Sequence, residues 1–232
     1  MQAEELLYQQ TYNTQVIITD HMEKVGGLGG WRKPRVETVI KNLKYDRVFY
    51  VPGGADICPA IYGQKIHPTT QVSSYMPNST IYEAVLVRHL VDIGHPVLAI
   101  CRGHQLVHAA TGGDLVQDLS LLDASNHYQI VHVASEPGLF QDIVDSVKPP
   151  ERWGPSTMVL NHTHHQAVIR VGNGFKAVAT TPDGVVEAAE HLRNPVLTIQ
   201  FHPEYSDHPW SQWFIHTVLE YLGKFLPEEV SR

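Results

Sequence analysis

The sequence has few cysteines and no long apolar runs. Only Cys58 and Cys101 occur among its 232 residues. Two cysteines make no disulfide framework, and such scarcity is typical of a reducing compartment. No apolar run approaches the roughly 20 residues of a membrane span, so we expect no membrane association. The N-terminal sequence MQAEELLYQQTYNT lacks the basic and apolar regions of a signal peptide, so the expected location is the cytoplasm.

Positive charge is scarce as well. The chain has 17 lysines and arginines against 24 aspartates and glutamates, a formal net charge of −7. No basic cluster offers a phosphate-binding face, so we expect no nucleic-acid partner. Repeats and low-complexity tracts are absent from the sequence. With 43% hydrophobic residues, the chain is long enough to bury one large core. We predict a single domain over residues 1–232, with 1–14 as a loosely ordered N-terminal segment.

Strand and helix patterns alternate through the first half of the chain. They lie, strand first, at residues 15–19, 35–43, 46–51, 79–94, 96–100 and 102–113. Ser79 suits the N-cap of its helix, and Gly94 suits the C-terminal stop. A Gly-rich loop fills residues 23–31. This β-α-β-α-β order predicts an α/β fold whose mostly parallel central sheet has helices on both faces.

The second half of the chain is less regular. Its patterns at residues 127–135, 175–181 and 184–190 predict a smaller region of antiparallel strands and hairpins. Residues 195–204 read as another buried strand with a polar end. The last helix, over residues 209–226, is predicted to dock on the core. Its apolar side chains keep helical spacing, and they include Trp213, Phe214, Val218, Tyr221, Leu222 and Phe225.

Cys101 lies where the apolar run VLAI gives way to the helical pattern RGHQL. In α/β sheets, reactive groups lie at the carboxyl ends of strands. A thiol attacks as its thiolate, and both a helix N-terminus and a nearby histidine favour that form. Ala99 and Gly103 are small enough for a tight strand-to-helix turn, as in the serine elbow of α/β-hydrolases. We predict a nucleophile here, although a lone cysteine is more often a core residue.

A second predicted strand end supplies the partners that such a nucleophile needs. In QFHPE, His202 would take the thiol proton and Glu204 would orient the imidazole. The main-chain N–H groups of Arg102 and Gly54 are candidate donors to an oxyanion, since Gly53 and Gly54 let the backbone approach a substrate closely. If a His–Cys ion pair forms, activity should rise from mildly acidic to neutral pH.

Five segments then occur in an order that resembles the class I glutamine amidotransferases. They are VPGGADICPAIYG, PVLAICRGHQLVHAATGGDLVQDL, NHTHHQAV, DGVVEAAEH and TIQFHPEYS, and they lie between residues 51 and 206. Within that family, the chain looks like the branch of γ-glutamyl-γ-aminobutyrate hydrolase and related γ-glutamyl peptidases. The resemblance implies a flavodoxin-like fold and cysteine attack on a γ-glutamyl amide, followed by hydrolysis of a glutamyl thioester. It implies no metal and no organic cofactor.

The resemblance also assigns roles by position. It makes Cys101 the nucleophile, His202 the base and Glu204 the orienting acid, with Gly54 and Arg102 as the oxyanion donors. The substrate-binding residues expected from the resemblance and from the patterns above are Gly53, Gln105, Asn161, His162, His165 and Glu187. The chain departs from the family at Ala99, His108 and His162, where glycine, asparagine and serine are usual. The loops that shape the leaving-group pocket are also unusual, so the amine specificity stays open.

Other groups of reactive residues have simpler interpretations. The histidines of NHTHHQ do not have the spacing of a zinc motif, so we expect no metal there. The resemblance explains His164, His165 and Gln166 as pocket or structural residues. Cys58 is interpreted as a small apolar residue beneath the oxyanion loop. Glu187 is either a substrate contact or a solvated hairpin residue. The expected partners are a small γ-glutamyl substrate and, as an open alternative, further copies of the chain.

The leading hypothesis is therefore a hydrolase of γ-glutamyl amides that acts alone. One alternative is a glutaminase subunit that passes ammonia to a separate synthase. Another is a γ-glutamyl transferase in which an amine replaces water. A silent binding module on the same fold is a further alternative, against which the complete Cys-His-Glu set argues.

Overall fold

The fold was analysed in a computed structural model of the chain. The structure describes residues 40, 43, 45–68, 76–122, 130–133, 137–147, 157–159, 164–205 and 209–227. The strand expected at 15–19, the loop at 23–31 and most of the helix at 35–43 lie outside the described residues. The N-terminal segment 1–14 lies outside them as well.

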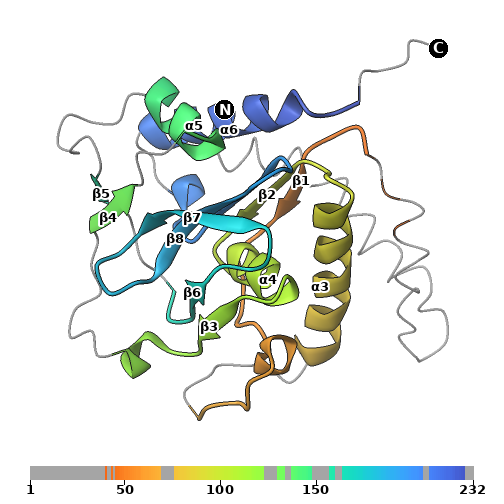
Figure 1. Cartoon of the computed structure of the whole chain (residues 1–232), viewed down its shortest axis with the longest axis vertical. Helices are drawn as coiled ribbons and strands as arrows, with labels where there is room; N and C mark the ends of the chain where they lie inside the picture. Colours follow the sequence, from red (N-terminus) through yellow and green to blue (C-terminus); the bar gives the residue numbers. More distant parts are fainter. Residues whose placement is uncertain are drawn as a thin grey trace.

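One large sheet runs through the described part of the chain (Figure 1). Its strands, in spatial order, are β1 (Phe49–Val51), β2 (Val97–Ile100), β9 (Val196–Ile199), β8 (Val186–His191), β7 (Phe175–Thr180), β4 (Ile130–Val133) and β5 (Thr157–Val159). The pairs β1–β2 and β2–β9 are parallel, and the remaining pairs are antiparallel. The antiparallel strands that the sequence indicated therefore extend the same sheet, so the described sheet is mixed rather than mostly parallel.

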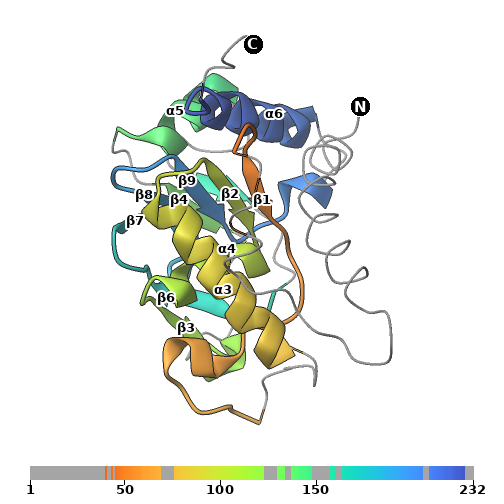
Figure 2. The same cartoon turned by 90° about the vertical axis from the view of Figure 1, so that its right-hand side faces the viewer.

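Helices cover both faces of this sheet, as the alternating pattern predicted (Figure 2). α3 (Met76–Asp92) and α4 (Arg102–Ala110) lie on one face, while α5 (Leu139–Val147) and α6 (Pro209–Gly223) lie on the other. Strand β2 is fully buried because its side chains contribute to the hydrophobic core on both faces of the sheet. Val97 and Ala99 join the core under α3 and α4, whereas Leu98 and Ile100 join the core under α5 and α6.

Short elements complete the fold. β3 (Asp114–Val116) and β6 (Ala167–Arg170) form a small antiparallel sheet. Three single-turn helices, η1 (Pro59–Tyr62), η2 (Leu119–Leu121) and η3 (Pro203–Tyr205), follow β1, β3 and β9 along the chain. Among these short elements, β3, β6 and η1 lie next to α4. The sequence reading missed β3 and β6, which are too short for their apolar spacing to stand out. It also missed α5, although the apolar residues of that helix keep helical spacing.

Two predicted details of the helices are wrong. Ser79 is not an N-cap, because α3 already begins at Met76. Pro77 explains the early start, since proline suits the first turn of a helix, where its missing N–H leaves no bond unmade. In α6, Phe214, Val218 and Leu222 are buried as expected. Trp213 in the same helix and Phe225, two residues beyond its end, are 61% and 55% exposed and do not belong to the docked face.

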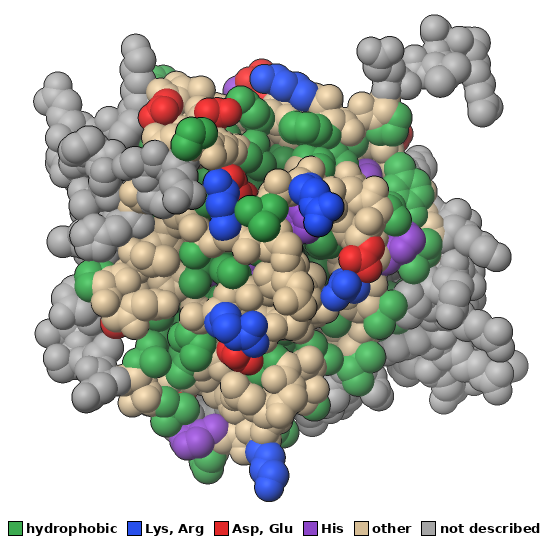
Figure 3. Space-filling view, viewed as in Figure 1, with side chains coloured by type: hydrophobic (Ala, Val, Ile, Leu, Met, Phe, Trp, Pro, Cys, Tyr) green, Lys and Arg blue, Asp and Glu red, His purple; other side chains and the backbone are tan. Residues whose placement is uncertain are grey.

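The described surface has no strongly charged region on the face seen in Figure 3, where acidic and basic side chains are interspersed. Among the described helices, none is long and apolar enough to cross a membrane.

Candidate active site

Cys101 occupies a sharp turn between β2 and α4. Its backbone angles are φ 52° and ψ −108°, and no other described non-glycine residue has a positive φ. An L-residue adopts this conformation only when its surroundings impose it, which is common at functional sites. The Cys101 N–H donates to the carbonyl of Ile199 at 2.8 Å, which ties the turn to the end of β9.

Gly103 shows why the turn requires a small residue after the cysteine. A methyl group at this position would lie 2.1 Å from the carbonyl oxygen of Val51. The first turn of α4 therefore packs directly on the end of β1, as the small flanking residues predicted. At the other flank, Ala99 is fully buried within β2, so the alanine in place of the usual glycine is accommodated.

His202 and Glu204 follow β9, the strand that pairs with β2. The Nδ1–H of His202 donates to Oε1 of Glu204 at 2.6 Å, and both side chains are buried. Cys101 forms a hydrogen bond with the same histidine. Since Glu204 occupies Nδ1, the structure brings a thiol and a carboxylate to opposite sides of one imidazole.

The surroundings of His202 favour its charged form. Burial alone would lower the pKa of the imidazole, because it removes water from the cation. The hydrogen bonds and negative charges of Cys101 and Glu204 outweigh that effect and raise the pKa of His202 to about 9. A histidine with this pKa is a cation at neutral pH, which suits an ion pair with a thiolate.

The loop after β1 lies against this group. A methyl group at Gly53 would lie 2.9 Å from Cε1 of His202 and 3.6 Å from Cβ of Cys101. At Gly54 the corresponding contact would be Cδ of Arg102, also at 2.9 Å. The two glycines therefore allow the loop to approach both the histidine and the start of α4.

The Arg102 side chain leads away from the cysteine toward α3. Its Nη2 lies 2.5 Å from Oε2 of Glu83, while its Nε is buried without a hydrogen-bond partner. The sequence reading assigned a role only to the Arg102 main chain and did not anticipate this ion pair. Cys58 is buried and forms no disulfide, which agrees with its interpretation as a packing residue.

Gln105 is one helical turn after Cys101, and its amide nitrogen donates to two acceptors. These are the main-chain carbonyl of Gln166 at 2.6 Å and Oε1 of Gln200 at 3.1 Å. The Nε2 of Gln200 is buried and has no hydrogen-bond partner. Sequence reasoning missed Gln200, although it lies inside the QFHPE motif. It expected Gln166 to be a pocket or structural residue but did not anticipate its contact with Gln105.

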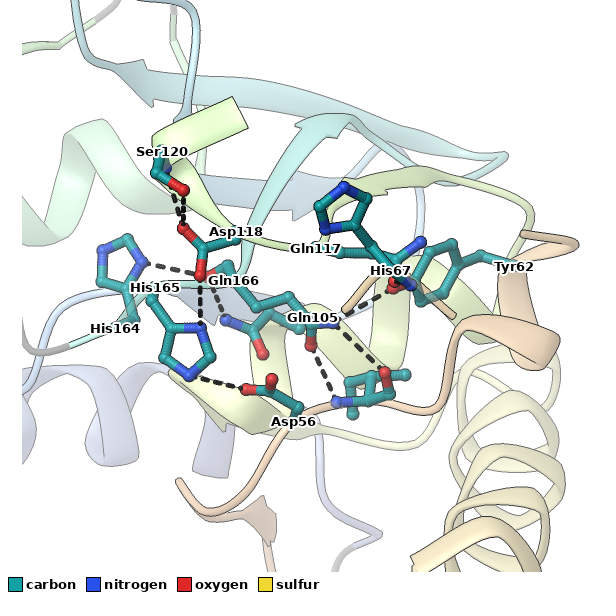
Figure 4. A network of polar contacts seen from close by, with 11 residues as sticks. Asp56, Tyr62, His67, Gln105, Gln117, Asp118, Ser120, His164, His165 and Gln166 are labelled. Carbon is teal, nitrogen blue, oxygen red and sulfur yellow. Dashed lines mark hydrogen bonds and ion pairs between the residues drawn. The ribbon is translucent and has the colours of Figure 1, made fainter. Parts of the chain in front are cut away.

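The remaining predicted binding residues divide into two groups. Glu187 is fully buried on β8, so it is not a solvated hairpin residue, and its Oε1 lies 3.7 Å from Nε2 of His164. His165 is partly exposed and lies between two carboxylates, 3.3 Å from Asp56 and 3.6 Å from Asp118 (Figure 4). The other two, Asn161 and His162, lie outside the described residues.

Two further histidines are part of the core behind the site. Nε2 of His104 donates to the Val186 carbonyl at 3.0 Å, and Nδ1 of His108 accepts from the Gly172 N–H at 3.1 Å. Their remaining ring nitrogens both contact Oγ1 of Thr198, at 2.8 and 3.1 Å. Burial lowers the pKa of His108 to about 3 and that of His104 well below its usual value. Both rings are therefore neutral structural groups.

Metal binding finds no support in the described residues. Within the described ranges, no three histidine, cysteine, aspartate or glutamate side chains are grouped so that they could hold a metal ion.

Comparison with known proteins places the sequence in a family. The sequence model described as peptidase C26 matches residues 10–204, a range that includes Cys101, His202 and Glu204. The chain belongs to the peptidase C26 family. It is a class I glutamine amidotransferase-like protein, as the sequence motifs indicated.

Two relatives illustrate the range of this peptidase C26 group. The Lactococcus lactis glutamine amidotransferase-like protein YvdE, whose assignment is provisional, is 34% identical over 155 residues, 66% of this chain and 63% of that protein. A Mycobacterium tuberculosis protein, Rv2859c, with a provisional assignment as a glutamine amidotransferase, is 37% identical over 166 residues, 67% of this chain and 50% of that protein. The chain thus spans between half and two thirds of the length of these relatives.

A solved structure supports the fold of this peptidase C26 member. It is a Thermoplasma acidophilum protein provisionally assigned as a component of GMP synthase, which matches with a TM-score of 0.50 at 16% identity. The match covers 77% of this chain and 94% of that one. The predicted flavodoxin-like α/β fold is therefore confirmed.

Proposed function

We propose that this protein hydrolyses γ-glutamyl amide bonds, in γ-glutamyl amines or peptides, through a glutamyl thioester on Cys101. The observation that carries the proposal is the arrangement of three side chains at one edge of the sheet. A cysteine in a strained turn hydrogen-bonds to His202, whose other nitrogen lies 2.6 Å from Glu204. This is the relationship of a nucleophile, its base and an orienting acid.

In the proposed acylation step, Sγ of Cys101 attacks the γ-carbonyl carbon and the carbonyl oxygen becomes an oxyanion. The N–H groups of Gly54 and Arg102 are the proposed donors to that oxygen. His202 then gives a proton to the leaving nitrogen as the carbon–nitrogen bond breaks. A free amine leaves, and the glutamyl group stays on sulfur as a thioester.

In the proposed deacylation step, water attacks the thioester carbon while His202 takes one of its protons. The carbon–sulfur bond breaks, glutamate leaves, and Cys101 returns to its ion pair with His202. Glu204 holds the imidazole by Nδ1 throughout, so that Nε2 faces the reacting atoms. The reaction as proposed needs neither a metal nor an organic cofactor.

The proposed binding pocket for the glutamyl group comprises the residues expected from the sequence, which are Gly53, Gln105, Asn161, His162, His165 and Glu187. The contact of Gly53 with His202 supports a position next to the reacting carbonyl. Asp56 and Asp118 gather negative charge around His165, which suits the α-ammonium group of a glutamyl substrate. We further propose a single cytoplasmic domain that needs no synthase partner.

The test is glutamate release by the purified protein. A panel of γ-glutamyl amines and dipeptides is offered beside L-glutamine, with Cys101→Ala as the inactive variant and Cys58→Ala as its matched control. We expect release from γ-glutamyl compounds by the wild type and by Cys58→Ala, and none by Cys101→Ala. Release from glutamine alone would instead indicate a glutaminase. Full activity of Cys101→Ala would overturn the assignment of the nucleophile.

A further inference from the structure

Gln166 is a fully buried glutamine directly before β6, and its side chain hydrogen-bonds to the loop that follows β1. Its Oε1 accepts from the main-chain N–H of Ile57 at 2.7 Å, and its Nε2 donates to the carbonyl of Ile57 at 3.2 Å. Nε2 also donates to the hydroxyl of Tyr62 in η1 at 3.1 Å. One amide thus binds both main-chain groups of a single loop residue (Figure 4).

The main chain of Gln166 is tied to the helix that carries the nucleophile. Its carbonyl accepts from Nε2 of Gln105 at 2.6 Å and from Nδ1 of His164 at 3.0 Å. Gln105 belongs to the first turns of α4, and its own N–H donates to the carbonyl of Cys101 at 3.1 Å. A continuous chain of hydrogen bonds therefore runs from Cys101 through Gln105 and Gln166 to Ile57.

The loop that Gln166 binds, residues 52–58, also contacts His202 through Gly53. Ile57 is three residues after Gly54, and Gly53 lies against the His202 ring. Residues 52–58 belong to no helix or strand, so regular hydrogen bonding does not fix their position relative to β2 and α4. Contacts such as those of Gln166 must do so instead.

We propose that Gln166 is a positioning residue that sets the distance between the Gly54 N–H and the sulfur of Cys101. The inference rests on the proposed function, because it matters only if an oxyanion forms between these two groups. An oxyanion donor must lie within about 3 Å of the charged oxygen, and loss of one donor typically costs 10²–10³-fold in kcat. A displaced loop would lose that donor without disturbing the thiol.

Two reactions of the same sulfur separate positioning from general damage. Iodoacetamide alkylates a thiolate as iodide leaves, and no oxyanion forms. p-Nitrophenyl acetate acylates it through an oxyanion, from which p-nitrophenolate leaves and an acetyl thioester remains. The ratio of the two rates at Cys101 therefore reports the oxyanion donors alone. Neither reagent requires that the natural substrate be known.

The variants are Gln166→Met, which keeps the length and removes the hydrogen bonds, and Gln166→Asn, which keeps the amide and shortens its reach. The matched control is Gln117→Met. Gln117 is also buried, and its side chain hydrogen-bonds to the loop after η1. It accepts from the His67 N–H at 2.8 Å and donates to the Lys65 carbonyl at 2.8 Å. That loop is not the one that carries Gly53 and Gly54.

For Gln166→Met we expect about a 10²-fold loss of acylation rate with alkylation within about twofold of the wild type. We expect a smaller acylation loss for Gln166→Asn, and no selective loss for Gln117→Met. Equal losses in both reactions, unchanged acylation, or the same selective loss in Gln117→Met would overturn the proposal. So would failure of both Gln166 variants to fold, which would make the residue a folding determinant. If the wild type is acylated but cleaves no γ-glutamyl compound, the proposed function fails while this test still stands.

Discussion

Nδ1 of His202 and Oε1 of Glu204 lie 2.6 Å apart with only Pro203 between the two residues in sequence. The carboxylate both orients the ring and helps to raise its pKa. Changing Glu204 to Gln keeps the size but removes the charge. We expect kcat to fall by on the order of 10²–10⁴-fold, because the amide no longer enforces one tautomer of the imidazole. Steady-state kinetics with the best γ-glutamyl substrate measures this.

The matched control for this change is Glu220→Gln, on the exposed face of α6, where Glu220 pairs with His216. It removes the same charge from a His–Glu pair that is far from the cysteine in sequence and exposed. We expect its kcat to stay within about twofold of the wild type. Equal activity of Glu204→Gln and the wild type would show that Glu204 does not orient the base.

The pH dependence of activity follows from the raised pKa of His202. In the proposed mechanism the imidazolium protonates the leaving amine. With a pKa of about 9, it persists through neutral pH and is lost as the pH rises through 9. We therefore expect kcat/KM to fall above pH 9. A profile from pH 5 to 10.5 measures it, including the rise from acidic to neutral pH predicted for the ion pair. A falling limb centred below pH 8 would contradict the assignment to His202.

Gly53 offers a steric test of the same histidine. In Gly53→Ala, the new methyl group would meet His202 Cε1 at 2.9 Å, so the ring or the loop must move by a few tenths of an ångström. We expect kcat to fall about 10–100-fold, since catalysis is sensitive to small displacements of a base. The control is Gly223→Ala, where a methyl group has open space around it. If the two variants are equally active, the Gly53 contact is irrelevant to the reaction.

The parts of the site that the sequence made visible are those attached to strand ends. VLAI is buried on both faces and stops at Cys101, and the strand before His202 behaves in the same way. Such runs locate the edge of a sheet, so the residues that follow them could be predicted to lie close together. The sequence also indicated β7 and β8, but their place in the same sheet depends on pairing between distant segments, which periodicity does not specify.

Side-chain hydrogen bonds between distant segments are what the sequence could not reveal. Gln166 and Ile57 are 109 positions apart, and nothing in either residue type specifies the other. The same holds for Arg102 with Glu83, since a surface-type glutamate on α3 gives no sign that it pairs with a buried arginine. The number of histidines in the sequence likewise did not indicate what role each histidine has. His104 and His108 turn out to be neutral core groups, a role that depends on Thr198, a residue 90 positions beyond His108 in sequence.

Thr198 is expected to contribute more to stability than its size suggests. Its hydroxyl lies within 3.1 Å of a ring nitrogen of both His104 and His108. Thr198→Val preserves the shape but leaves these buried nitrogens without that partner, which should lower the free energy of unfolding by about 1–3 kcal/mol. Urea denaturation at pH 7 measures the loss.

The matched control is Thr111→Val. Thr111 directly follows α4, and its hydroxyl donates to the Val107 carbonyl in that helix, which also accepts the Thr111 N–H. Removing the hydroxyl there leaves no buried group wholly unpaired, so the loss should stay below about 1 kcal/mol. If Thr198→Val loses no more than Thr111→Val, the two imidazoles do not depend on the threonine.

The same histidines should make the fold sensitive to acid. Burial holds the pKa of His108 at about 3, whereas an unfolded histidine titrates near 6.5. Below pH 6.5 the unfolded chain binds a proton that the folded chain refuses, so the free energy of unfolding falls with decreasing pH until about pH 3. The slope approaches about 1.4 kcal/mol per pH unit for each such histidine. His108→Asn removes one of these groups and should reduce the slope between pH 4.5 and 6 by about that amount, as measured by urea unfolding at several pH values. An unchanged slope would mean that His108 takes up its proton in the folded state as well.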